Sequence, residues 1–85
     1  MTYKAAFTSE FLKTLKKLKK RDLTLFNRLV TEITEILDSP ERYKALKGSL
    51  RGLRRAHVRP FVVVFKVGEN TVTFVSFKHH DKAYK

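Results

Sequence analysis

The spacing of apolar residues predicts two helices in the first half of the chain. The first set lies three or four positions apart and consists of Phe11, Leu12, Leu15 and Leu18. This spacing predicts an amphipathic helix over residues 9–20, with Thr8 or Ser9 as its N-cap. The second set has the same period and consists of Phe26, Leu29, Val30, Ile33, Ile36 and Leu37. Asp22 can cap this second helix and Pro40 ends it, so we expect an antiparallel hairpin across a short link.

Strand patterns dominate the second half of the chain. The predicted strands cover residues 53–58, 61–65 and 71–77, and the segment 61–65 is entirely β-branched and aromatic. Residues 3–7 are predicted to form a short first strand. The order is therefore β-α-α-β-β-β, an α+β fold in which a helical hairpin packs on a small antiparallel sheet. We expect residues 1–85 to form a single domain.

The charge of the chain narrows the classes of partner. Nineteen Lys and Arg residues against eight Asp and Glu residues give a formal net charge of +11 at pH 7. The excess is greatest in residues 44–60, which hold six basic residues and no acidic one. Such a surface attracts polyanions, so nucleic acid is the first candidate partner and an acidic protein the second. The mutual repulsion of these charges favours a monomer when the protein is free.

The composition also disfavours several classes of protein. The chain has no cysteine, which rules out disulfides and thiolate metal sites and fits a reducing, cytoplasmic location. It has no signal-peptide pattern, and no segment approaches the roughly 20 apolar residues of a membrane helix. Gly48 and Gly52 are not followed by a helix pattern, so they do not form a phosphate-binding loop. We expect no cofactor.

The histidines supply the candidate chemistry. Strand alternation places Arg55 and His57 on one face, with Ala56 and Val58 turned toward the helices. Cleavage of RNA without a metal needs a base for the 2′-hydroxyl, an acid for the leaving 5′-oxygen and cations for the phosphorane. Histidine suits the first two roles and arginine the third. The residues that could meet these needs are His57, His80, Arg54, Arg55 and Lys78.

The same residues also have structural interpretations. A histidine on a strand is more often a surface or structural residue than a catalyst. His79 and His80 are neighbours, so on a strand they point to opposite faces and do not chelate a metal together, and we predict no metal site. Tyr84 could stack on a base or hold a phosphate, or it could cover the open end of the core.

Two segments carry a recognisable order of residues. The first runs Leu46-Lys47-Gly48, Gly52, Arg54 and His57-Val58-Arg59-Pro60, and the second is His80-Asp81-Lys82-Ala83-Tyr84. This order resembles the RelE/ParE superfamily of toxins from toxin–antitoxin pairs, over essentially the whole chain, and within it the YafQ branch. The resemblance implies an endoribonuclease that cleaves mRNA in the ribosomal A site and inhibits translation. It also implies a small, acidic, partly disordered antitoxin that binds the toxin in a higher-order complex.

The resemblance also implies roles for individual residues. His57 and His80 would be the acid–base pair, and Tyr84 the terminal aromatic. Basic residues would hold the RNA, namely Lys44, Lys47, Arg51, Arg54, Arg59, Lys78 and Lys82.

The chain departs from the family pattern at four positions. Lys44 stands where the YafQ branch has a histidine, and Arg55 and Phe61 stand where it has acidic residues. Val62 stands where the wider RelE pattern has an arginine. We expect Arg55 to stabilise charge in place of that missing arginine, and the division of base and acid between the two histidines stays open.

Other functions share this pattern of charge and elements. A ParE-type inhibitor of DNA gyrase would have the same fold but would need neither the paired histidines nor the terminal aromatic. A non-catalytic nucleic-acid-binding protein, or an inactive toxin homologue, would keep the positive charge and tolerate loss of His57 and His80.

Overall fold

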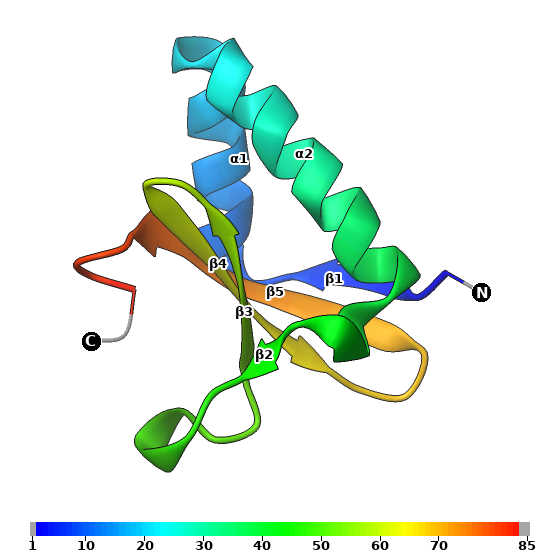
Figure 1. Cartoon of the computed structure of the whole chain (residues 1–85). Helices are drawn as coiled ribbons and strands as arrows, with labels where there is room; N and C mark the ends of the chain where they lie inside the picture. Colours follow the sequence, from blue (N-terminus) through cyan, green and yellow to red (C-terminus); the bar gives the residue numbers. More distant parts are fainter. Residues whose placement is uncertain (1, 84–85) are drawn as a thin grey trace.

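The structure, a computed structural model, describes residues 2–83 of the chain. Its strands are β1 (Lys4–Phe7), β2 (Lys44–Ala45), β3 (Arg54–Val58), β4 (Phe61–Val67) and β5 (Thr71–His79). Its helices are α1 (Ser9–Arg21) and α2 (Leu23–Asp38), with the short 3-10 helices η1 (Pro40–Arg42) and η2 (Gly48–Leu50). The strands form one sheet in the order β1-β5-β4-β3-β2, and both helices lie over one of its faces (Figure 1). The predicted α+β fold is confirmed.

Side-chain caps define both helices of the hairpin. The Thr8 hydroxyl accepts a hydrogen bond from the Phe11 N–H at 3.1 Å, and it donates one to the Val75 carbonyl at 2.7 Å. Asp22 lies between the helices, where its backbone N–H bonds to the Leu18 carbonyl and its carboxylate accepts the Leu25 N–H at 3.1 Å. The predicted caps and the predicted hairpin are therefore confirmed.

The sheet is mixed, which corrects the prediction of a small antiparallel sheet. Strands β3, β4 and β5 pair antiparallel, but β1 pairs parallel with β5. The Thr8 N–H bonds to the Phe74 carbonyl at 3.1 Å, so the chain leaves β1 alongside β5 and enters α1 directly. A short apolar strand does not encode the direction of its partner, so the alternation in residues 3–7 could not predict this pairing. Strand β2 was also not predicted, because two residues are too few to form a pattern.

The two faces of the sheet have different surroundings. The helix-covered face holds the main core, in which Phe11, Leu29 and Ile36 pack with strand residues such as Phe65 and Phe74. Ala56 and Val58 are buried in this core, as predicted. On the other face, within residues 2–83, Val62, Val64 and Ala83 form a smaller cluster, against which Leu53 and Val75 pack. Because Arg55 and His57 alternate with the core residues of β3, they lie on this second, open face.

Candidate active site

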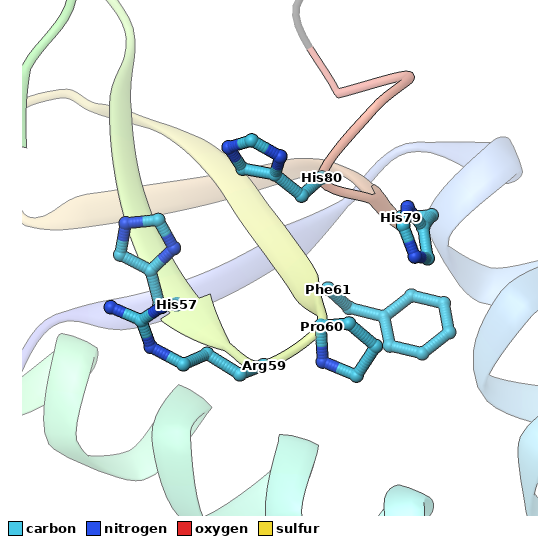
Figure 2. A pocket seen from close by; sticks show the side chains of 6 residues that line it. All are labelled: His57, Arg59, Pro60, Phe61, His79 and His80. Carbon is cyan, nitrogen blue, oxygen red and sulfur yellow. The ribbon is translucent and has the colours of Figure 1, made fainter.

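A cavity of about 310 Å³ lies at the end of the sheet, where the turn between β3 and β4 meets the end of β5. Its lining consists of His57, Arg59, Pro60, Phe61, His79 and His80 (Figure 2). Two hydrogen bonds hold these segments together. The His80 N–H donates to the Pro60 carbonyl at 2.9 Å, and the Arg28 guanidinium of α2 donates to the Arg59 carbonyl at 2.9 Å. Helix α2 and the end of β5 thus hold the turn between β3 and β4 in position.

His57 projects from β3 into this cavity, and its position in the ladder is opposite Val62. Partial burial of the imidazole lowers the pKa of His57 below its ordinary value, and the positive charges of Arg55, Arg59 and His80 lower this pKa further. The His57 residue is nevertheless exposed. At neutral pH the ring is therefore neutral and can accept a proton.

His80 follows β5 and approaches the same cavity from the other side (Figure 2). Its Nδ1 lies 3.6 Å from a carboxylate oxygen of Asp81, and the other Asp81 oxygen lies 3.6 Å from the Nδ1 of His79. One carboxylate is therefore shared by two imidazoles, and it forms an ion pair with whichever ring is protonated. The structure brings His57, His80 and Arg59 together at one cavity.

Arg55 lies beside this cavity and does not line it. It shares the open face with His57, and its positive charge acts on the His57 ring. Lys44 pairs directly with Arg55 in the ladder, and Lys78 pairs with Val62 in the row that also holds His57. Since paired residues point to the same side of a sheet, these cations start from the face that carries His57.

The charged groups of two predicted RNA-binding residues contact other parts of the protein outside the cavity. The Arg54 guanidinium donates to the carbonyls of Glu41 and Tyr43, at 3.2 Å and 2.7 Å, and so anchors η1 to β3. The Lys78 ammonium lies 3.7 Å from the Glu10 carboxylate at the start of α1. Neither side chain lines the cavity.

The remaining predicted residues are spread around the site. Lys47 and Arg51 flank η2 and are exposed, in a loop that projects from the sheet away from the helices (Figure 1). Lys82 is exposed in the turn after β5, where its N–H bonds to the His79 carbonyl. Tyr84 lies outside the described residues.

Three residues that line the cavity were not predicted as site residues: Pro60, Phe61 and His79. His79 was considered only as a metal ligand, on the argument that neighbouring strand residues face opposite ways. That argument fails to exclude it from the site because the cavity lies at the end of the sheet and is open to both faces. The two adjacent histidines shortly after the predicted strand 71–77 were the signal that could have found it.

Two further features are absent within residues 2–83. No group of three or more histidine or acidic side chains is placed to hold a metal ion. No helix combines the length and apolar character required to cross a bilayer.

Comparisons with known proteins identify the family. A family model described as the ParE toxin of a type II toxin–antitoxin system, parDE, matches residues 5–84. The chain is also 43% identical over 76 residues to RelE4 of Methanocaldococcus jannaschii, which is named as a candidate toxin. That match covers 86% of this chain and 81% of the archaeal protein.

Solved structures share the fold at lower sequence identity. The YoeB/ParE toxin from Agrobacterium tumefaciens superposes with a TM-score of 0.80 at 14% identity, over 91% of this chain and 98% of that chain. The toxin in the Escherichia coli DinJ–YafQ toxin–antitoxin complex superposes with a TM-score of 0.73 at 21% identity, over 100% of both chains. The family model and the archaeal relative, which span most of the chain, show that it belongs to the ParE toxin family of the RelE/ParE superfamily and is a toxin of a type II toxin–antitoxin system.

Proposed function

We propose that this toxin is a ribosome-dependent endoribonuclease, which cleaves mRNA in the ribosomal A site without a metal ion and thereby inhibits translation. The observation that carries the proposal is the cavity shared by His57 and His80, with Arg59 at its rim. Two imidazoles beside a guanidinium are the groups that cleavage of a phosphodiester by acid–base catalysis requires. The resemblance to the YafQ branch, which carries both histidines in the same order, supports the same function.

The two histidines take different roles in this proposal. His57 acts as the base, because its lowered pKa keeps the ring neutral at physiological pH. It removes the proton of the 2′-hydroxyl, whose oxygen attacks the adjacent phosphorus. The bond from phosphorus to the 5′-oxygen then breaks, and His80 gives a proton to that oxygen. The products are a 2′,3′-cyclic phosphate and a 5′-hydroxyl, and Arg55 and Arg59 stabilise the charge of the phosphorane.

The small size of the site supports dependence on the ribosome. His57 and His80 are exposed side chains that line a cavity of about 310 Å³, at the small end of ligand pockets. In-line attack requires the 2′-oxygen, the phosphorus and the 5′-oxygen to be aligned before reaction. We propose that the ribosome supplies this alignment, so the purified toxin cuts free RNA poorly. Efficient cleavage of free RNA would contradict this part of the proposal.

We also propose an acidic antitoxin as the partner, bound over the basic surface of residues 44–60 and ordered on binding. The similar E. coli toxin is described in a complex with DinJ, which supports an antitoxin here. The affinity should fall as salt increases. A salt-independent complex would instead indicate an apolar interface, such as the cleft between the helices, which is lined by Phe7, Leu15, Lys16, Lys19, Phe26, Val30, Ile33 and Thr34.

Cell-free translation with mapping of mRNA 5′ ends tests the proposed function. The wild-type toxin should produce in-frame cuts in translated mRNA, and His80→Ala should remove them. A matched Lys20→Ala protein should still cut, because Lys20 is an exposed residue of α1 and does not line the cavity. Intact mRNA with normal translation would contradict the proposal.

Inhibition of DNA gyrase is the second candidate function, and the ParE description of the matching family model favours it. A gyrase inhibitor needs no acid–base pair, so His57→Ala and His80→Ala would leave its activity unchanged. A supercoiling assay with purified gyrase separates the two functions. Inhibition that persists in both variants would favour gyrase as the target.

A further inference from the structure

We propose that Pro60, Phe61 and His79 form a nucleobase-binding wall, which holds the base of a ribonucleotide beside the phosphate that faces His57 and His80. This inference rests on the proposed function. It adds a site that positions the substrate, made of residues that were not predicted from the sequence as site residues. All three residues line the same cavity as the two proposed catalytic histidines (Figure 2). At about 310 Å³, the cavity falls at the small end of ligand pockets, which span roughly 300–1,000 Å³.

The wall is rigid because its rings are packed. The Phe61 ring stacks on Phe77 of the core, with centroids 5.1 Å apart and planes at 22°. The His79 ring meets Phe61 edge-on, with centroids 5.8 Å apart and planes at 75°. Two rings at nearly a right angle form a corner, and a flat base can stack on one ring while its edge meets the other. Aromatic rings that are already ordered bind bases at little cost in conformational entropy.

The hydrogen bonds of His79 define what the corner can recognise. The backbone N–H of Asp81 donates to the Nδ1 of His79 at 3.2 Å, so in the neutral ring the proton is on Nε2. The His79 side chain is 48% exposed, which leaves part of the ring accessible to a ligand. An Nε2–H donor selects for acceptors such as the carbonyl oxygens of pyrimidines or the ring nitrogens of purines.

The charge around the corner favours a nucleotide over an apolar peptide side chain. Arg59 lines the same cavity, and Arg55 acts on the neighbouring His57. A ligand that combines a flat ring with a phosphate can stack in the aromatic corner and also interact with the positive charge beside it. An aromatic side chain of a protein would fill the corner but would bring no phosphate to Arg59.

Binding of small nucleotides, followed by NMR of the protein, tests the wall without relying on cleavage. The probes are uridine 3′-monophosphate and adenosine 3′-monophosphate, with ribose 5-phosphate as the base-free control. We expect the nucleotides to shift the ring resonances of Phe61 and His79, and we expect His79→Ala to weaken their binding at least fivefold. His79→Phe, which keeps a stacking ring, should retain most of the affinity. Ribose 5-phosphate should bind more weakly, and His79→Ala should not affect it.

The result that overturns the proposal is equal binding of nucleotides and ribose 5-phosphate, or nucleotide binding that leaves the Phe61 and His79 rings unperturbed. Nucleotide shifts in a protein that cuts no translated mRNA would overturn the proposed nuclease but retain the base-binding wall. Cleavage of translated mRNA without these shifts would retain the proposed nuclease and overturn the base-binding wall. In a protein that cuts, His79→Ala should also change which bases flank the cuts, whereas His80→Ala should remove the cuts.

Discussion

Adjacent residues of β3 have different roles because a strand turns successive side chains to opposite faces. Arg54 points toward η1 and donates hydrogen bonds to the carbonyls of Glu41 and Tyr43, whereas Arg55 shares the open face with His57. From the sequence alone, both arginines were predicted to bind RNA or its phosphate. The alternation instead makes Arg54 a structural residue, and it leaves Arg55 and Arg59 to set the charge around His57.

The pKa of His57 should rise when Arg59 is replaced by alanine, because a nearby cation that disfavours the imidazolium is removed. NMR titration of the imidazole measures this directly. Lys20→Ala, on the exposed face of α1, should leave the pKa unchanged and serves as the control. An unchanged or lower pKa in Arg59→Ala would contradict the electrostatic account of the site.

The lowered pKa of His57 also predicts how stability depends on pH. In the unfolded chain a histidine titrates near about 6.5, above the pKa of His57 in the fold. As the pH falls below about 6.5, the unfolded state binds this proton before the folded state does. His57 therefore lowers the free energy of unfolding at acidic pH, and it has no such effect at higher pH. His57→Gln should therefore reduce the loss of stability between neutral and mildly acidic pH. Urea unfolding at two pH values checks this, and an unchanged pH dependence would count against it.

Arg54→Ala should lower the free energy of unfolding by about 1–2 kcal/mol, because two backbone carbonyls lose a charged donor. Urea denaturation of the purified protein provides the measurement. The matched control is Arg51→Ala in the exposed loop, for which a change within about 0.5 kcal/mol is expected. Equal effects of the two substitutions would mean that the Arg54 hydrogen bonds contribute little.

At the scale of elements, the sequence pattern predicted the helices and strands that local periodicity defines. It missed the features that depend on pairing with a segment far away along the chain. Both helices, their caps and the three long strands follow from periodicity and from Thr8, Asp22 and Pro40. The parallel pairing of β1 and the two-residue β2 depend on contacts with β5 and β3, which no local pattern encodes. His79 was missed for the same reason, since it joins the site only where three strand ends meet.

Thr8 connects two elements and provides a test of the helix–sheet junction. Its hydroxyl caps α1 and also bonds to a carbonyl of β5, so Thr8→Val should destabilise the protein by about 1–2 kcal/mol. Thr8→Ser keeps the hydroxyl, so it should destabilise the protein much less than Thr8→Val does. The difference between the two variants in urea unfolding isolates the hydroxyl from the methyl group. If serine and valine cost the same, the two hydrogen bonds are not important for stability.

For the whole molecule, the distribution of charge is more informative than its total. Both helices, of which α1 carries the lysines, lie on one side of the sheet, and the loop with Lys47 and Arg51 projects from the other (Figure 1). The open face between that loop and the end of β5 carries His57. A single-stranded nucleic acid that follows this face would reach the cavity, whereas one bound along α1 would not.

The salt dependence of RNA binding should reflect this asymmetry. Replacing Lys47 and Arg51 with serine should reduce the slope of log affinity against log salt by about 1.4 for an uncleavable 2′-O-methyl RNA, at about 0.7 for each phosphate contact. The matched pair Lys13 and Lys17 on α1, replaced in the same way, should change the slope much less. Fluorescence anisotropy at several salt concentrations supplies the data. Equal changes for both pairs would indicate that only net charge matters.

The central claim is that His57 and His80 act together as base and acid on one phosphodiester. Single-turnover cleavage of mRNA on programmed ribosomes tests it most directly, with the wild type, His57→Gln and His80→Gln compared at saturating toxin. We predict a 2′,3′-cyclic phosphate and a 5′-hydroxyl as the new ends, and a loss of rate of about 100-fold or more for each variant. Cleavage by both variants at the wild-type rate, or ends of another kind, would contradict the account.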